Sequence, residues 1–130
     1  DPFLTSSAVR LIVAQSIIRL ICPNCKEEIS KDSHERFAYL NLPEEDQKTL
    51  KIYRGKGCSY CGNTGYRGRA GLYEILPISP DIQELIIAKS APFTIKAKAV
   101  SEGMLALRDT AIIKLKDGLT TVEEVLGATS

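Results

Sequence analysis

The first long apolar stretch of the chain covers residues 8–21, where 10 of the 14 residues are apolar. Four polar residues interrupt it, namely Arg10, Gln15, Ser16 and Arg19. On a helix, these apolar positions would cover most of the circumference and would not form a single stripe. We therefore predict a helix that starts at Ser6 or Ser7, ends near Ile21 and is covered on more than one side.

The middle of the chain is polar and rich in glycine, with two short apolar stretches. Residues 51–54 and 72–76 predict short strands, and Pro43 predicts the first position of a short helix. Six glycines lie between residues 55 and 71. This density indicates turns and close backbone approaches and excludes a regular helix there.

Helix signals dominate after Pro77. Ser79, Pro80 and Asp81 combine a capping hydroxyl, a proline in the first turn and an acid at the positive end of the helix dipole. Further helices are predicted at residues 93–102 and 105–117. A capping box at residues 120–123 predicts a last short helix that ends near Gly127.

These elements predict an α+β fold in three consecutive parts. Residues 1–21 would form a terminal helix, 22–78 a small cysteine-bearing subdomain with short strands, and 79–130 a small helical subdomain. The chain begins at Asp1 without an initiator Met, and we expect it to be a piece of a longer protein. The stretch 8–21 is too short and too interrupted to span a bilayer, and no signal peptide is visible.

Composition and charge narrow the class of protein. Hydrophobic residues make up 44% of the chain, so a mostly disordered protein is excluded. Seventeen basic and 16 acidic residues give a net charge of +1, which argues against a dedicated nucleic-acid binder. Cysteines grouped in CxxC pairs favour a reducing compartment over a secreted disulfide scaffold.

The four cysteines carry the clearest chemistry in the sequence. They form two CxxC pairs, Cys22 with Cys25 and Cys58 with Cys61, and 32 residues separate the pairs. Four thiolates in this arrangement are typical ligands for a closed tetrahedral Zn²⁺ site, which is structural and not catalytic. A redox dithiol, buried apolar cysteines and an iron–sulfur cluster are weaker alternatives.

Charge near the second cysteine pair has two interpretations. Residues 53–69 contain four cations, Arg54, Lys56, Arg67 and Arg69, and no acid. This local charge of +4 is placed to balance the formal −2 of a zinc–tetrathiolate centre, and it also fits contact with phosphates. His34, the sole histidine, lies in a polar stretch and is predicted to be a solvated surface residue.

Several motifs resemble the C-terminal part of the type II secretion and type IV pilus assembly ATPases. The residues after Gly57 are the most specific, because the second CxxC is followed by TGY, GR and GLYE at residues 64–74. The stretch that leads into the first CxxC also resembles this family. So do the Glu102-Gly103-Met104 element with Leu107-Arg108 and the Gly118-Leu119-Thr120-Thr121 element.

The resemblance implies a parent protein that is a hexameric ATPase with a RecA-like core. Residues 1–130 contain no phosphate-loop motif, so we expect this chain to have no catalytic residues. ATP and Mg²⁺ would bind only in the full-length parent. The resemblance further implies contact with the rest of the ATPase, with neighbouring hexamer subunits and with the inner-membrane platform protein, in the cytoplasm at the inner membrane.

The leading functional hypothesis is thus a non-catalytic, zinc-stabilised lobe that couples or docks a secretion or pilus motor to its machinery. The alternative is a free-standing zinc ribbon that binds nucleic acid, motivated by Tyr53, Tyr60 and Tyr66 among the four cations. A co-chaperone zinc domain fits poorly, because Asn63 breaks its CxxCxGxG repeat. A redox role would require reactive thiols.

Overall fold

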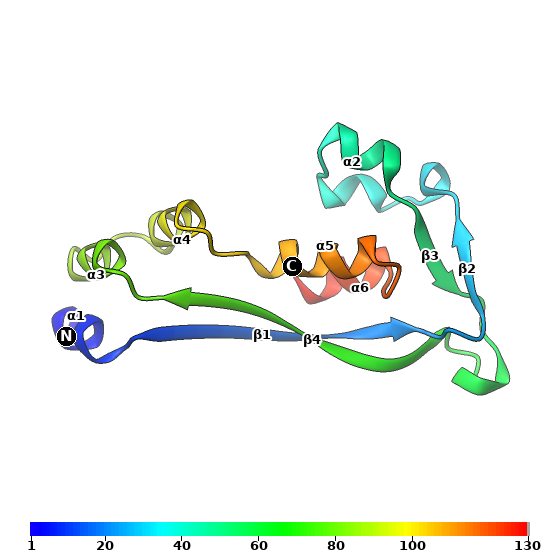
Figure 1. Cartoon of the computed structure of the whole chain (residues 1–130), viewed down its shortest axis with the longest axis horizontal. Coiled ribbons are helices and arrows are strands. Elements are labelled where there is room, and N and C mark those ends of the chain that lie inside the picture. Colours follow the sequence, from blue (N-terminus) through cyan, green and yellow to red (C-terminus); the bar gives the residue numbers. More distant parts are fainter. Residues whose placement is uncertain (130) are drawn as a thin grey trace. The chain divides into compact units, whose positions relative to one another are not determined.

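The structure is a computed structural model that describes residues 1–129, without the side chain of Ser6. The chain combines helices with two-stranded sheets, which confirms the α+β class (Figure 1). The chain forms two compact units. The first combines residues 1–15 with 73–107, and the second combines residues 16–72 with the described residues from 108 onward.

The first unit packs three helices in sequence. Helix α1 (Pro2–Ala8) contacts α3 (Pro80–Ile87), which contacts α4 (Pro92–Ser101). The Ser79 hydroxyl accepts a hydrogen bond from the Ile82 N–H, which confirms the predicted cap of α3. Ile82 and Ala99 provide buried packing within this unit.

The second unit is built round a small antiparallel ribbon. Strand β2 (Lys26–Ile29) pairs with β3 (Ile52–Gly55), so that Lys26 lies opposite Gly55 and Ile29 lies opposite Ile52. The segment between these strands forms two 3-10 turns, η1 (Lys31–Ser33) and η2 (Phe37–Leu40), and helix α2 (Glu44–Thr49). Helices α5 (Leu107–Lys116) and α6 (Val122–Ala128) complete the unit, and α6 contacts η2.

An aliphatic core holds the second unit together, as expected for a chain without Trp. Its fully buried members are Ile18, Ile52, Leu72, Leu115, Val122 and Val125. They come from strands β1 (Leu11–Ile21), β3 and β4 (Tyr66–Pro77) and from helices α5 and α6. The C-terminal helices therefore share one core with the cysteine-bearing strands, whereas the sequence suggested consecutive and separate subdomains.

The predicted helix over residues 8–21 is wrong. Residues Leu11–Ile21 form strand β1, whose hydrogen-bonded neighbour is β4 (Tyr66–Pro77). Six of the 14 residues at positions 8–21 are β-branched, which favours an extended backbone. Ser7 lies inside α1 and Ser6 is within the same helix, so neither residue starts a helix of its own.

Other elements differ from the prediction in smaller ways. The strand at residues 72–76 belongs to the longer β4, and the acidic stretch after Cys25 contains the unpredicted strand β2. The last helix is capped by Thr121, not by Thr120, because the Thr121 hydroxyl accepts from the Glu124 N–H at 3.2 Å. The Thr120 hydroxyl instead donates to the carbonyl oxygen of Arg19.

Candidate metal centre

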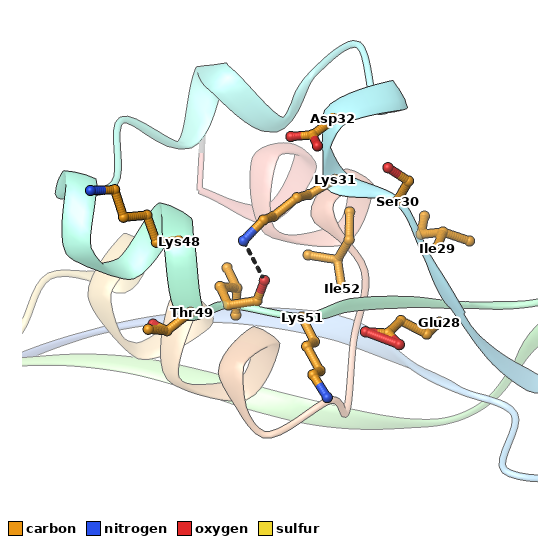
Figure 2. A pocket seen from close by; sticks show the side chains of 10 residues that line it. Glu28, Ile29, Ser30, Lys31, Asp32, Lys48, Thr49, Lys51 and Ile52 are labelled. Carbon is orange, nitrogen blue, oxygen red and sulfur yellow. Dashed lines mark hydrogen bonds between the residues drawn. The ribbon is translucent and has the colours of Figure 1, made fainter.

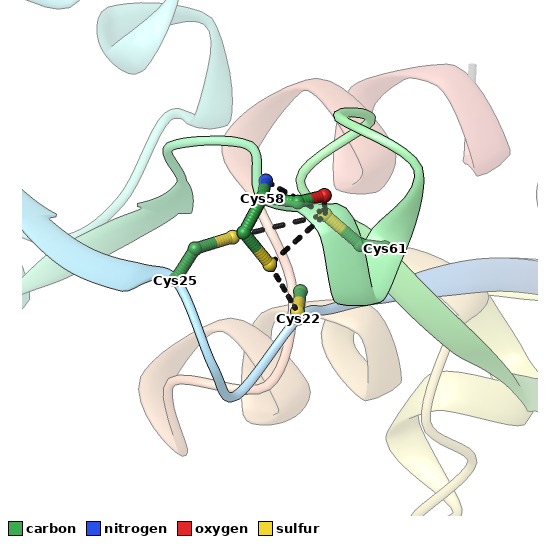
Figure 3. A group of neighbouring side chains, drawn as sticks. All are labelled: Cys22, Cys25, Cys58 and Cys61. Atoms are coloured by element: carbon green, nitrogen blue, oxygen red, sulfur yellow. Dashed lines mark hydrogen bonds between the residues drawn. The ribbon is translucent and has the colours of Figure 1, made fainter.

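The four cysteines meet at one end of the second unit. Cys22 and Cys25 flank the turn between β1 and β2. Cys58 precedes the 3-10 turn η3 (Ser59–Cys61) between β3 and β4, and Cys61 ends it. Figure 3 shows all four side chains pointing toward one another. Cys22 and Cys61 are buried, and the other two cysteines are partly exposed.

The sulfur atoms are spaced as a tetrahedral metal site requires. All four Sγ atoms lie within 4.8 Å of one another. The shortest separations are 3.7 Å for Cys58–Cys61, 3.8 Å for Cys22–Cys58 and 3.9 Å for Cys25–Cys61. A tetrahedron with Zn–S bonds of about 2.3 Å has sulfur–sulfur edges of about 3.8 Å. The donor set and its geometry therefore fit a zinc ion.

Polar N–H groups surround the sulfur atoms and offset their negative charge. The backbone N–H of Gly57 donates to Cys25 Sγ, and the N–H groups of Cys58 and Gly65 donate to Cys61 Sγ at 3.3 and 3.2 Å. The side-chain amide of Asn24 donates to Cys58 Sγ at 3.3 Å. Sequence reasoning missed Asn24, although its position inside the first CxxC placed it close to the sulfurs.

The surroundings move the thiol pKa values in opposite directions. Burial raises the pKa of Cys25 to about 11, against the opposing effect of the Gly57 N–H. Burial also acts to raise the pKa of Cys61, but the N–H groups of Cys58 and Gly65 outweigh it and lower that pKa to about 6. The amide of Asn24 lowers the pKa of Cys58. Hydrogen bonds thus prepare part of the cluster to act as thiolate ligands.

A close backbone contact fixes the turn that carries the second cysteine pair. A Cβ atom on Gly55 would lie 2.0 Å from the carbonyl oxygen of Gly65. A Cβ on Gly65 would lie 2.4 Å from the Gly55 oxygen, and Gly65 has a φ of +81°. Only glycine fits both positions. The carbonyl oxygen of Gly65 also accepts from the Cys22 N–H, which ties the two CxxC turns together.

The four cations near the second cysteine pair do not touch the sulfur atoms in the described part of the chain. Arg54 pairs with Glu27 at 2.9 Å, and the guanidinium of Arg67 lies 3.9 Å from the centre of the Tyr60 ring. Lys56 and Arg69 are exposed. The N–H donors to the sulfur atoms are therefore amide groups, and balance of the site by the local charge of +4 stays a prediction.

His34 is not the solvated surface residue that the sequence predicted. Its side chain is only 12% exposed, and its Nε2 atom lies 2.7 Å from a carboxylate oxygen of Glu123 at the start of α6. Burial acts to raise the pKa of Glu123, but its own N–H and the bond with His34 lower it overall. This pair fastens the segment after β2 to the last helix.

Apart from the cysteine cluster, the same unit has a pocket between β2, β3 and α2, and no cysteine lines it (Figure 2). Its volume is about 430 Å³. Lys31 crosses it to donate to the carbonyl oxygens of Gln47 and Leu50 at the end of α2, which neutralises the negative end of that helix dipole. The amine of Lys31 is thus engaged in the fold.

These features define a small α+β protein whose second unit carries a tetracysteine cluster able to hold a metal ion. No helix among the described residues is long and apolar enough to cross a membrane. The family model described as "Type II/IV secretion system protein" matches residues 1–127, and the chain belongs to this family. The family resemblance seen in the sequence is thereby confirmed.

The similar proteins are named as ATPases of two related systems, type IV pilus assembly and type II secretion. The chain is 35% identical over its whole length to a type IV pilus assembly ATPase PilB of Myxococcus xanthus, of which it covers 23%. It is 36% identical over 99% of its length to a PilB of Thermus thermophilus, of which it covers 14%. It is 34% identical over 99% of its length to the type II secretion system ATPase E of Vibrio cholerae, of which it covers 25%. The chain thus spans a quarter or less of these relatives.

Proposed function

We propose that Cys22, Cys25, Cys58 and Cys61 hold a structural zinc ion that stabilises a non-catalytic lobe of a longer secretion or pilus-assembly ATPase. The observation that carries the proposal is the convergence of four sulfur atoms within 4.8 Å, with three separations of 3.7–3.9 Å that match the edges of a zinc tetrahedron. Four protein thiolates leave no open position for water or substrate. The site therefore serves to fix the fold and not to catalyse a reaction.

Nucleotide chemistry would then reside in the remainder of the parent protein. The 130 residues contain no phosphate-loop motif, and the relatives that are named ATPases are at least about four times longer than this chain. In this proposal, ATP and Mg²⁺ bind only in the full-length parent, which acts as a hexamer. The metal-bound lobe couples or docks the motor to the inner-membrane machinery from the cytoplasmic side.

Apolar surface in the first unit supports the view that further protein covers it. Ile12 and Val13 on β1 are 47% and 51% exposed, and Phe93 on α4 is 83% exposed. Successive residues of a strand face opposite sides, so β1 presents apolar side chains on both faces. Surfaces of this kind mark interaction sites in soluble proteins. The rest of a family member or a neighbouring subunit would provide the cover.

The proposal is tested in the intact protein with the double variant Cys58→Ser and Cys61→Ser. We expect loss of bound zinc, measured by elemental analysis, and loss of secretion or pilus assembly in cells that produce the variant. Ser59→Ala, an exposed substitution between the two ligands, serves as the matched control and should keep both properties.

A conservative ligand change separates metal binding from cysteine chemistry. Cys25→His retains a zinc ligand in a Cys₃His set and should keep zinc and much of the assembly activity. A redox role would instead be abolished by this change. Normal assembly by the Cys58→Ser and Cys61→Ser double variant, with its zinc absent, would contradict the proposed function.

A further inference from the structure

An exposed tyrosine–arginine pair lies on the turn that the metal centre fixes. Tyr60, between Cys58 and Cys61, is 53% exposed although it is a large aromatic residue. The guanidinium carbon of Arg67 lies 3.9 Å from the centre of its ring, and Arg67 Nη1 donates to the Tyr60 carbonyl oxygen at 2.9 Å. Arginine has five N–H donors, so most of those on Arg67 are available to a partner.

This pair is held in place before any partner arrives. Tyr60 lies in η3, which Cys58 precedes and Cys61 ends, and Arg67 is fixed by both the stacking contact and the hydrogen bond. Fixing side chains in advance reduces the entropy lost on association. Tyrosine and arginine are also the residue types enriched at the energetically important centres of protein interfaces.

The surroundings of the pair are cationic. Lys56 and Arg69 are exposed, and neither has an acidic partner within the described residues, whereas Arg54 is paired with Glu27. Nearby acids of the same unit are engaged elsewhere, because Glu123 pairs with His34 and Glu124 pairs with Arg19. We call the exposed side chains of Tyr60, Arg67 and Arg69 together the tyrosine–arginine patch.

We propose that the tyrosine–arginine patch docks a short acidic segment of a protein partner, an inference that rests on the proposed docking function of the lobe. Guanidinium groups bind carboxylates through paired hydrogen bonds, and the ring of Tyr60 adds apolar contact area. A long polyanion such as nucleic acid fits less well. The net charge of the chain is only +1, and Arg54, a further cation of this segment, is already paired with Glu27.

Binding is tested on the full-length, zinc-loaded protein with a fluorescent peptide that alternates glutamate and serine. The same peptide with glutamine in place of glutamate is the ligand control. We expect the double variant Arg67→Gln and Arg69→Gln to weaken binding of the glutamate peptide by about tenfold or more in fluorescence anisotropy. Lys51→Gln, which removes another exposed cation of this unit, should leave binding within about twofold.

Three outcomes would overturn the inference. These are equal affinity for the glutamate and glutamine peptides, unchanged affinity in the Arg67→Gln and Arg69→Gln variant, and tighter binding of a single-stranded oligonucleotide or of anionic phospholipid vesicles than of the glutamate peptide. Zinc content is measured for each variant, so that loss of the fold is distinguished from loss of the patch.

Assays in cells separate this inference from the proposed function. We expect the Arg67→Gln and Arg69→Gln variant to retain zinc and to lose secretion or pilus assembly. If this variant assembles normally while the Cys58→Ser and Cys61→Ser variant does not, the patch is not the docking surface and the proposed function stands. If both variants assemble normally, the proposed function is wrong as well.

Discussion

Gly55 and Gly65 determine how closely the two halves of the metal centre approach, because their backbones are in direct contact. Gly65 combines three roles, since its N–H donates to Cys61 Sγ, its carbonyl oxygen accepts from Cys22 and its φ of +81° lies in the left-handed region. A side chain at this position would push β3 away from the turn. The spacing of the sulfur atoms therefore depends on a residue that is not itself a ligand.

Substitution of Gly65 by alanine should lower the free energy of unfolding of the metal-loaded protein by about 3 kcal/mol. The change combines left-handed backbone strain with a clash against the Gly55 carbonyl. Denaturant unfolding followed by circular dichroism measures it. Gly127→Ala is the matched control, because Gly127 lies in α6 with open space round it. This substitution should raise the free energy of unfolding by up to about 1 kcal/mol. Equal stability of the two variants would contradict the assigned role of Gly65.

Zinc affinity should increase with pH because the ligands must lose protons. With a pKa of about 11, Cys25 holds its proton at neutral pH and releases it when the metal binds, whereas Cys61, with a pKa of about 6, is already largely thiolate. For each proton that zinc binding releases, the zinc affinity increases about tenfold when the pH rises by one unit. Acidification below about pH 6 protonates Cys61 too, and the affinity should then fall more steeply.

Competition with a chelator of known pH dependence, at several pH values between 5 and 9, measures the zinc affinity. Cys25→His provides the control, because a neutral imidazole releases no proton near pH 8. The slope of log zinc affinity against pH should therefore be smaller by about one near pH 8 in this variant. An unchanged slope would show that Cys25 is already deprotonated in the metal-free protein.

The sequence pointed to the four cysteines that the structure brings together, but not to the groups that hydrogen-bond to their sulfur atoms. The CxxC spacing identifies all four cysteines by itself, because a tight turn brings paired thiols together. The Asn24 side chain reaches Cys58 Sγ only when the two turns pack against each other, and the Gly65 N–H reaches Cys61 Sγ through the left-handed backbone of its own turn. The contact between His34 and Glu123 joins residues 89 positions apart, which no local pattern reveals.

At the level of elements, β1 shows why a local pattern misleads. Its apolar residues surround a helical wheel, and a strand with apolar side chains on both faces gives the same run of apolar letters. The deciding information was the partner strand β4, which lies far along the chain and completes the hydrogen bonds of β1. Helices α3, α4 and α6 were predictable because their start or stop signals, such as Ser79 and Gly103, are local.

Helix α6 is fastened to the cysteine-bearing strands through its first turn. The hydroxyl of Thr121 caps the helix and also lies 2.8 Å from the hydroxyl of Tyr66 on β4. Glu124, one turn into the helix, accepts from the backbone and side chain of Arg19 on β1 at 2.8 Å. The C-terminal helix is therefore part of the same folded body as the metal centre.

Replacement of Thr121 by valine should lower the free energy of unfolding by about 1–2 kcal/mol. Valine keeps the shape of this 3%-exposed side chain but removes the cap of α6 and leaves the half-buried Tyr66 hydroxyl without this partner. Thr49→Val is the control, since Thr49 is exposed at the end of α2 and is expected to change stability by less than about 0.5 kcal/mol. Similar losses in both variants in thermal unfolding would refute the role of the cap.

At the level of the whole molecule, the two units depend on different interactions. The second unit surrounds four cysteines with a small aliphatic core, whereas helices α1, α3 and α4 of the first unit contain no metal ligand. Metal binding energy in such a site is largely folding energy, because the ligands come together only in the folded chain. Removal of the metal should therefore affect the two units unequally.

Hydrogen exchange before and after treatment with a zinc chelator tests this difference. Amides of β2, β3 and the turn from Gly57 to Gly65 should lose protection, since their alignment depends on the thiolate cluster. Amides of α3 and α4 should keep the protection that they have in the zinc-loaded protein. In the Cys22→Ser variant, the same amides of β2, β3 and the turn should lack protection without chelator. Addition of the chelator should then cause no further change in exchange. Loss of protection throughout both units, or in neither, would show that the metal does not selectively stabilise the cysteine-bearing unit.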